Sequence, residues 1–141
     1  MPKKHHLFIY YSAAFVNTIG VFVLSQGLTS QALMDTDPTL FSRFGLVMIM
    51  MWGVCYYACA QAAYTHRSIS VSFALEKLIY VCMWIMFILG PVDWSQLYER
   101  DLLAGLFYSI YGVIDAIYLT LFLYCAYHAR PAEVGDEASS S

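Results

Sequence analysis

Charged residues are scarce in this chain of 141 residues, because only 12% of them are Asp, Glu, Lys or Arg. A soluble domain carries about 25% charged residues, so this chain cannot cover a water-exposed surface in the usual way. The scarcity argues against a monomeric soluble enzyme. A basic surface is missing as well, since the net charge is −3, and nucleic acid is therefore not an expected partner.

Cysteine pairs with a redox or disulfide spacing are also missing. The four cysteines Cys55, Cys59, Cys82 and Cys125 all lie inside apolar runs, whereas disulfide frameworks join the loops of small secreted domains. Cys55 and Cys59 lie four residues apart, which is not the CxxC spacing. We interpret all four as small apolar packing residues.

Long apolar segments are abundant in the sequence, which has 60% hydrophobic residues and a mean hydropathy of +0.60. A bilayer core of about 30 Å needs about 20 apolar residues in a helix. The segments that are long enough are residues 7–28, 44–64, 71–92 and 102–127. Because the connections are short, we predict an all-α integral membrane protein, a four-transmembrane-helix up-down-up-down bundle. It forms one domain, residues 1–130, and residues 131–141 are expected to be a disordered cytoplasmic tail.

The distribution of Lys and Arg predicts the orientation. With four crossings both termini share a side, and that side has five basic residues, while the other has only Arg43 and Arg100. We therefore expect both termini in the cytoplasm (N-in/C-in) of a multi-pass protein, in a bacterial inner membrane. A signal peptide is the alternative for residues 7–28, but the apolar run is longer than the roughly 7–15 residues of a signal h-region.

Asp115 is the most informative polar residue, because it lies in the middle of the last predicted span. Thirteen residues of that span precede it and twelve follow it. An aspartate at that depth costs roughly 2.5–3.5 kcal/mol on insertion scales, so it should face the protein interior. Tyr108 lies on the same helical stripe, and Tyr111 and Tyr118 flank it, at spacings that allow their hydroxyls to meet the carboxyl.

Asn17 lies near the middle of the first predicted span, and we predict a hydrogen bond between Asn17 and Asp115 across the first and last helices. The alternative is that the two residues only hold the helices together, which contributes about 0.6 kcal/mol in typical membrane proteins.

Glu76 and Lys77 precede an uncharged stretch, residues 78–92, that is too short to cross the hydrocarbon core at about 1.5 Å per residue. Both residues should then lie just below the cytoplasmic surface. We expect Lys77 to extend its ammonium group to that surface. Glu76, on one face with Tyr80, should meet a cation or a hydroxyl from another helix. A charge pair in the headgroup zone is the alternative.

Aromatic residues predict the character of the interior. If Trp52 and Tyr56 point inward with Tyr80 and Tyr111, the interior is suited to a flat hydrophobic molecule. Any aromatic-rich bundle has the same appearance. No metal site is expected, because the histidines lack the i, i+3 or i, i+4 pairing of helical metal ligands. No standard catalytic motif is present, and the sequence leaves the cofactor unknown.

The layout resembles the DoxX-like class of small bacterial membrane proteins. The likeness consists of four spans, an acidic outer loop after the first span and a short cytoplasmic turn after the second. It involves no motif and transfers no residue role to this chain.

These features favour a non-enzymatic binding, carrier or accessory module with an Asp115-centred polar site. Its partners would be the bilayer, a hydrophobic small molecule or a proton, and further copies or a larger membrane complex. One alternative is a membrane-embedded enzyme that acts on a lipid or quinone with Asp115 and Glu76 as acid and base. The other is a purely structural subunit of a larger membrane complex.

Overall fold

The structure is a computed structural model that describes residues 1–129, and within that range it contains helices and no strand. The predicted tail, residues 131–141, lies outside the described residues. The long segments are α1 (Lys3–Phe15) continued by η1 (Val16–Gly20) and α2 (Val21–Leu24), then α4 (Arg43–Cys59), α5 (Arg67–Ile88) and α7 (Leu102–Tyr127). The short elements are α3 (Gln31–Thr36), η2 (Ala62–Tyr64) and α6 (Trp94–Arg100).

Three of the long segments could cross a membrane by length and composition. They are Lys3–Leu24, α5 and α7, with 22, 22 and 26 residues and mean hydropathies of 1.8, 1.8 and 1.7. The apolar helix α4 has 17 residues and falls short of this length. The all-helical class is therefore confirmed, and the three apolar helices fit a membrane protein.

The local backbone conformation, and not the length of the apolar runs, sets the ends of these helices. The first segment ends at Leu24, because Gln26, Gly27 and Leu28 all have positive φ values, 53°, 69° and 66°. The helix α5 begins at Arg67, directly after the extended residue His66. As a result the first and third helices, residues 3–24 and 67–88, each lie four residues earlier than the predicted spans 7–28 and 71–92. The last helix has the predicted bounds, residues 102–127.

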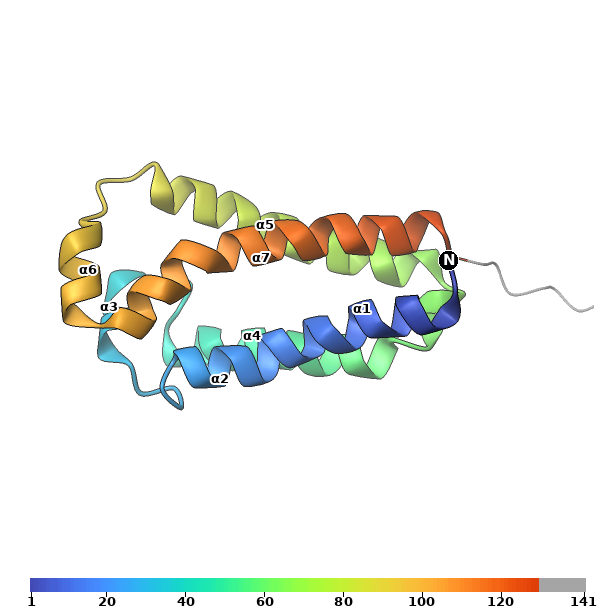
Figure 1. Cartoon of the computed structure of the whole chain (residues 1–141), viewed down its shortest axis with the longest axis horizontal. Helices are drawn as coiled ribbons and strands as arrows, with labels where there is room; N and C mark the ends of the chain where they lie inside the picture. Colours follow the sequence, from blue (N-terminus) through green and yellow to red (C-terminus); the bar gives the residue numbers. More distant parts are fainter. Residues whose placement is uncertain (130–141) are drawn as a thin grey trace, which may run out of the picture.

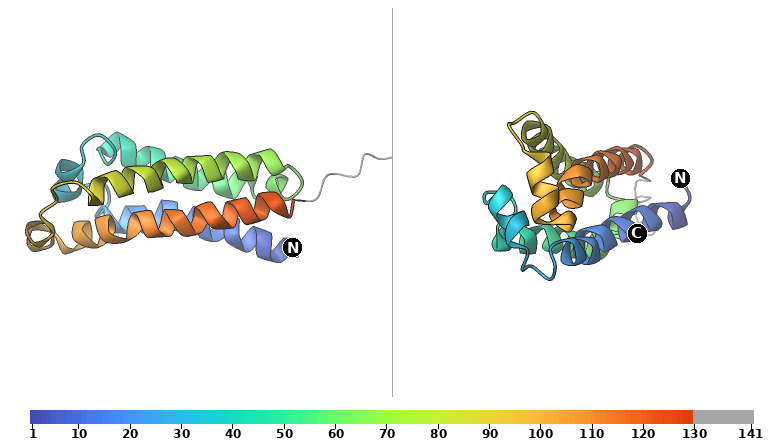
Figure 2. Two further views of the ribbon diagram at one scale, coloured as in Figure 1. Left: turned by 90° about the horizontal axis from the view of Figure 1, so that it is seen from above. Right: turned by 60° about the vertical axis from the view of Figure 1, so that its left-hand side comes forward.

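The long helices run side by side along the long axis of the molecule (Figure 1). The most extensive contacts join α5 to α7, and the first segment packs on α4. The beginning of α1 and the end of α7 lie at one end of the molecule, and α3 and α6 lie at the other, as Figure 2 shows from two further directions. We call these the terminal end and the capped end.

The interior is divided into two apolar clusters, one nearer each end. At the terminal end, Tyr10, Tyr56, Phe73 and Phe122 pack ring against ring with centroid distances of 4.8–5.9 Å. At the capped end, Phe41 contacts the rings of Phe107, Tyr108 and Tyr111 at 4.8–5.3 Å. Many large apolar side chains lie on the outside, as expected for a surface that faces lipid; examples are Phe8, Phe44 and Ile79.

Asp101 joins the loops at the capped end to α7. Its carboxylate accepts hydrogen bonds from the backbone N–H groups of Leu103 and Ala104, and from the side chains of Ser30 and Gln26. Burial acts to raise the pKa of Asp101, but these hydrogen bonds outweigh it and hold the pKa below its ordinary value. The carboxylate therefore caps the helix and attaches the connection after α2 to it.

The contact between α5 and α7 depends on a glycine. A Cβ atom at Gly112 would overlap Cβ, Cγ and Cδ2 of Trp84, atoms that belong to the rigid part of that side chain. The same tryptophan donates a hydrogen bond from Nε1 to the carbonyl of Tyr108, at 2.8 Å. The absence of a side chain at residue 112 therefore sets how closely the two helices approach.

We predict that Gly112→Ala destabilises the protein by about 1–3 kcal/mol, the usual cost of overpacking. Gly20→Ala is the matched control, because the nearest atom to a Cβ there is Val16 Cγ1 at 3.9 Å. The control should be neutral or gain up to about 1 kcal/mol from helix propensity. The stabilities of the two variants are compared by unfolding in mixed detergent micelles, followed by circular dichroism. Equal stabilities would show that the contact with Trp84 does not determine how closely α5 and α7 pack.

Candidate functional site

A buried ion pair joins α5 to α7 at half their length. The ammonium nitrogen of Lys77 lies 2.6 Å from Oδ1 of Asp115. The residues are 1% and 7% exposed. Lys77 has ten residues of α5 before it and eleven after it, and Asp115 has thirteen residues of α7 before it and twelve after it. The two opposite charges therefore meet at the middle of the most extensive helix contact. Their mutual attraction compensates for the hydration that each charge loses on burial.

The position of Lys77 corrects the expectation that its ammonium group reaches the cytoplasmic surface. That expectation placed Lys77 near the start of the third span, whereas α5 begins ten residues before it, at Arg67. From the middle of a helix the lysine stem cannot reach either end. The side chain instead turns inward to the carboxylate, which satisfies both charges.

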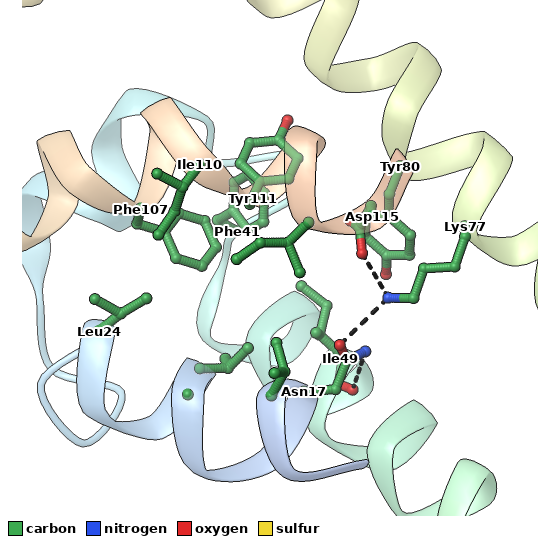
Figure 3. Close-up of a pocket in the computed structure, with 14 residues that line it drawn as sticks. Asn17, Leu24, Phe41, Ile49, Lys77, Tyr80, Phe107, Ile110, Tyr111 and Asp115 are labelled. Carbon is green, nitrogen blue, oxygen red and sulfur yellow. Dashed lines mark hydrogen bonds and ion pairs between the residues drawn. The ribbon is translucent and has the colours of Figure 1, made fainter. Parts of the chain in front are cut away.

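Asn17 binds the same ammonium group from the first segment. Lys77 Nζ donates to Asn17 Oδ1 at 3.3 Å, and Asn17 Nδ2 donates to the carbonyl of Ile49 at 3.5 Å. The predicted pairing of Asn17 with Asp115 is thus replaced by an arrangement in which Lys77 contacts both (Figure 3). Asn17 lies in η1, a π-helical turn, and such turns are frequent at functional sites.

Glu76 lies beside the pair without joining it closely. The hydroxyl of Tyr56, on α4, donates to its Oε2, so Glu76 meets a hydroxyl from another helix, as the sequence predicts. Its Oε1 is buried without a partner among the described residues, and it lies 3.9 Å from Lys77 Nζ. The rings of Tyr56 and Tyr80 lie 5.4 and 5.8 Å from that nitrogen, within cation–π range.

A pocket of about 60 Å³ adjoins the ion pair. Asn17, Lys77, Tyr80 and Asp115 supply its polar wall, and apolar residues supply the rest: Val16, Gly20, Val21, Leu24, Phe41, Ile49, Phe107, Ile110, Tyr111 and Ile114. Figure 3 shows these side chains between the first segment and α7.

The pocket opens to the side of the molecule. Its wall residues Val16, Gly20, Leu24 and Ile114 are half-buried, and Ile110 is exposed, so the rim lies on the outer surface between η1–α2 and α7. Along the molecule the ion pair lies between the two aromatic clusters described above, with Tyr56 and Phe122 on one side and Phe41 and Phe107 on the other. The approach to Asp115 is therefore lateral.

The structure brings some of the predicted site residues together and separates others. Asp115, Asn17, Tyr80 and Tyr111 line the pocket, and Glu76 and Tyr56 lie behind Lys77. The remaining three lie in the apolar clusters. Trp52 and Tyr118 pack at the terminal end, and Tyr108, at the capped end, donates its hydroxyl to the carbonyl of Leu33.

Lys77 is the functional candidate that sequence reasoning placed elsewhere. The signal for it was present, because a lone lysine inside an apolar segment needs an acidic partner in another segment, and Asp115 has the matching depth. The groups in the site can donate, accept and hold charge. Among the described residues no group of three or more His, Cys, Asp or Glu could hold a metal ion.

Comparison of the chain with protein-family models, with curated proteins and with solved structures gave no match in any of the three. The resemblance to the DoxX-like class therefore has no support beyond layout.

We predict that Lys77→Met lowers stability by about 3–5 kcal/mol, because it leaves the buried Asp115 carboxylate without its partner. The double variant with Lys77→Met and Asp115→Leu should recover most of that loss, since neither charge remains. Arg100→Met is the matched control. It breaks the exposed pair of Arg100 and Asp35, 2.5 Å apart, and should cost about 0–1 kcal/mol.

The measurement is a double-mutant cycle, which needs the free energies of unfolding in detergent of the native protein, the two single variants and the double variant. Additive losses from Lys77→Met and Asp115→Leu would show that the two groups are not coupled.

Proposed function

We propose that this chain is a multi-pass membrane protein with four spans that binds a small lipid-soluble molecule through the lateral pocket. It is expected to be non-enzymatic and to act as a binding or carrier module, N-in/C-in, in a bacterial inner membrane. The observation that carries the proposal is a mid-helix ion pair, Lys77 with Asp115, at the inner end of a pocket whose rim lies on the apolar surface.

The fourth span in this proposal is α4 with its extension. The 17 residues of α4 rise about 26 Å, slightly less than the hydrocarbon core of about 30 Å. The short helix η2 continues the same segment to Tyr64. The helix α4 packs along the first segment. If α4 crosses the membrane too, it covers the apolar face of the first segment that it contacts.

The polar wall indicates what kind of molecule fits. The ion pair is internally balanced, so it offers no net charge to a charged ligand. Asp115 Oδ2 and the Tyr80 hydroxyl have no hydrogen bond within residues 1–129, and they provide an acceptor and a donor. A neutral amphiphile with a hydroxyl group, such as a long-chain alcohol or a phenol, would satisfy both.

The volume sets a limit on what enters. A pocket of about 60 Å³ takes a polar head and a few carbon atoms, because binding sites for whole drug-sized molecules have roughly 300–1,000 Å³. The apolar remainder of the ligand would then leave by the lateral rim and lie in the bilayer.

Catalysis by two carboxyl groups is less well supported than binding. Asp115 lines the pocket, but Glu76 does not, and a pair of acid–base residues must reach the same substrate. The apolar outer surface, which includes Met86 and Leu123, would face lipid or further copies of the chain.

The four-span arrangement is tested with single cysteines in a variant without native cysteines. In intact cells a membrane-impermeant maleimide should label Ser95→Cys, but should label Lys3→Cys and Ser68→Cys only after permeabilisation. If α4 did not cross, the turn before α5 would lie outside and α6 inside, so Ser68→Cys and Ser95→Cys would exchange their patterns. Ile117→Cys, on the exposed apolar face of α7, is the control that should stay unlabelled in both conditions.

Ligand binding is tested with a photoreactive long-chain alcohol added to liposomes that contain the protein. Labelled peptides should map to η1, α2 and α7 around the pocket. Ile114→Trp fills the pocket and should reduce labelling about tenfold, which corresponds to about 1.4 kcal/mol of lost binding. Ile117→Trp is the matched control, because Ile117 is 53% exposed and does not line the pocket. Equal labelling of the two variants, or label spread over all apolar faces, would refute lateral binding.

A further inference from the structure

We propose that Glu76, Lys77 and Asp115 together bind one exchangeable proton, and that Glu76 holds it. This inference goes beyond ligand binding and stands without it, because it depends only on which charges lie together in the interior. The cluster is built from α5 and α7, with Asn17 and Tyr56 added from the two facing segments.

The cluster holds one amine and two carboxyl groups. Oxygens of the two carboxyls lie 2.6 and 3.9 Å from the same ammonium nitrogen. No other cation compensates them within residues 1–129, since the remaining ion pair there joins Arg100 to Asp35 in the exposed region. Two carboxylates and one ammonium would leave a net negative charge in a low-dielectric interior, which is costly. One proton removes that charge.

The other groups that face the cluster do not supply a charge. They are the phenols of Tyr56 on α4 and Tyr80 on α5, the amide of Asn17 on η1 and, on α7, Asp115 itself with Tyr111 in the same pocket. Phenols and an amide are neutral near pH 7. The net charge of the cluster therefore depends on the two carboxyl groups and Lys77.

The geometry assigns the proton to Glu76. Asp115 receives the ammonium group at hydrogen-bond distance, whereas Glu76 Oε1 is too far from Lys77 for a hydrogen bond and is buried without a partner. An ionised carboxylate with an unpaired oxygen is far more costly to bury than a neutral carboxylic acid. The Tyr56 hydroxyl satisfies the second oxygen, Oε2, in either state.

The pocket supplies a route for exchange. Its volume of about 60 Å³ is several times the roughly 10–15 Å³ that a cavity needs to hold one water molecule, and Asn17, Lys77 and Asp115 provide the polar partners that such a water needs. Lys77 lines this pocket and separates it from Glu76. In an exchange, Lys77 Nζ would give a proton to Glu76 Oε1, 3.9 Å away, and the lysine nitrogen would regain a proton from a water in the pocket.

Infrared spectroscopy of the purified full chain in lipid at pH 7 tests the proposal, because protonated carboxyl groups have a C=O stretching band that carboxylates lack. We expect one buried band in the native protein, with a shift in D₂O. Glu76→Gln should lose the band, and Asp115→Asn should lose it too, since Lys77 then pairs with Glu76. Lys77→Met should about double the band area, because two carboxyls then remain without a cation.

Two further measurements assign the proton to one residue. Tyr56→Phe removes the hydroxyl that donates to Glu76 and keeps the ring, so the band should move to higher frequency if Glu76 holds the proton and stay in place if Asp115 does. Carboxyl-¹³C glutamate in the otherwise native chain should shift the band, whereas ¹³C-aspartate should not, and this result needs no variant to fold. Glu99→Gln, at an exposed position, is the control that should leave the band unchanged.

The proposal is overturned if the native protein has no protonated-carboxyl band, or if Glu76→Gln leaves the band intact in a protein of native helix content. A band that responds only to aspartate labelling would also overturn it, because the proton would then be on Asp115. If the photoreactive alcohol fails to label the pocket while the infrared band is present, only the ligand-binding proposal is refuted. The two proposals can therefore fail separately.

Discussion

The ion pair between Lys77 and Asp115 is the constraint on which the arrangement of the helices depends. It lies halfway along both α5 and α7, so a slip of either helix by one turn would separate the charges by roughly 5 Å. Among residues 1–129 the second carboxyl group near Lys77 is that of Glu76, whose Oε1 lies 3.9 Å from the ammonium nitrogen and is too far for a hydrogen bond, so Asp115 is the close partner. The close packing of Trp84 on Gly112, one turn from Asp115, holds the same register by shape.

This constraint also explains why the interior has two apolar clusters instead of one. A charged layer at mid-depth interrupts the aromatic packing, so Phe122 and Phe41 belong to different clusters. Each cluster blocks the way to the ion pair along the molecule, and the η1 segment with Asn17 and Gly20 forms part of the remaining lateral opening. The polar layer and the pocket are thus two consequences of the same placement of charge.

The sequence allowed part of this to be predicted. Asp115 was placed at mid-depth and facing inward because thirteen and twelve apolar-rich residues flank it, and that argument needs no knowledge of the neighbouring helices. Lys77 was placed too near the end of its helix because the predicted third span begins at residue 71, whereas α5 begins four residues earlier, after the extended residue His66. The pocket depends on how far η1–α2 lies from α7, a distance that results from packing between segments and leaves no local pattern in the sequence.

The surroundings of the pair favour the proposed binding site over an arrangement that only holds the helices together. Polar groups that serve packing alone are stabilising when every hydrogen bond is made and the space around them is filled. Here Glu76 Oε1 is buried without a hydrogen-bond partner among residues 1–129, and a pocket of about 60 Å³ adjoins the charges. Leaving these two features in place costs stability and adds nothing to helix association. A molecule that fills the pocket, and a proton on Glu76, would each remove one of these costs, which is why both proposals centre on Lys77 and Asp115.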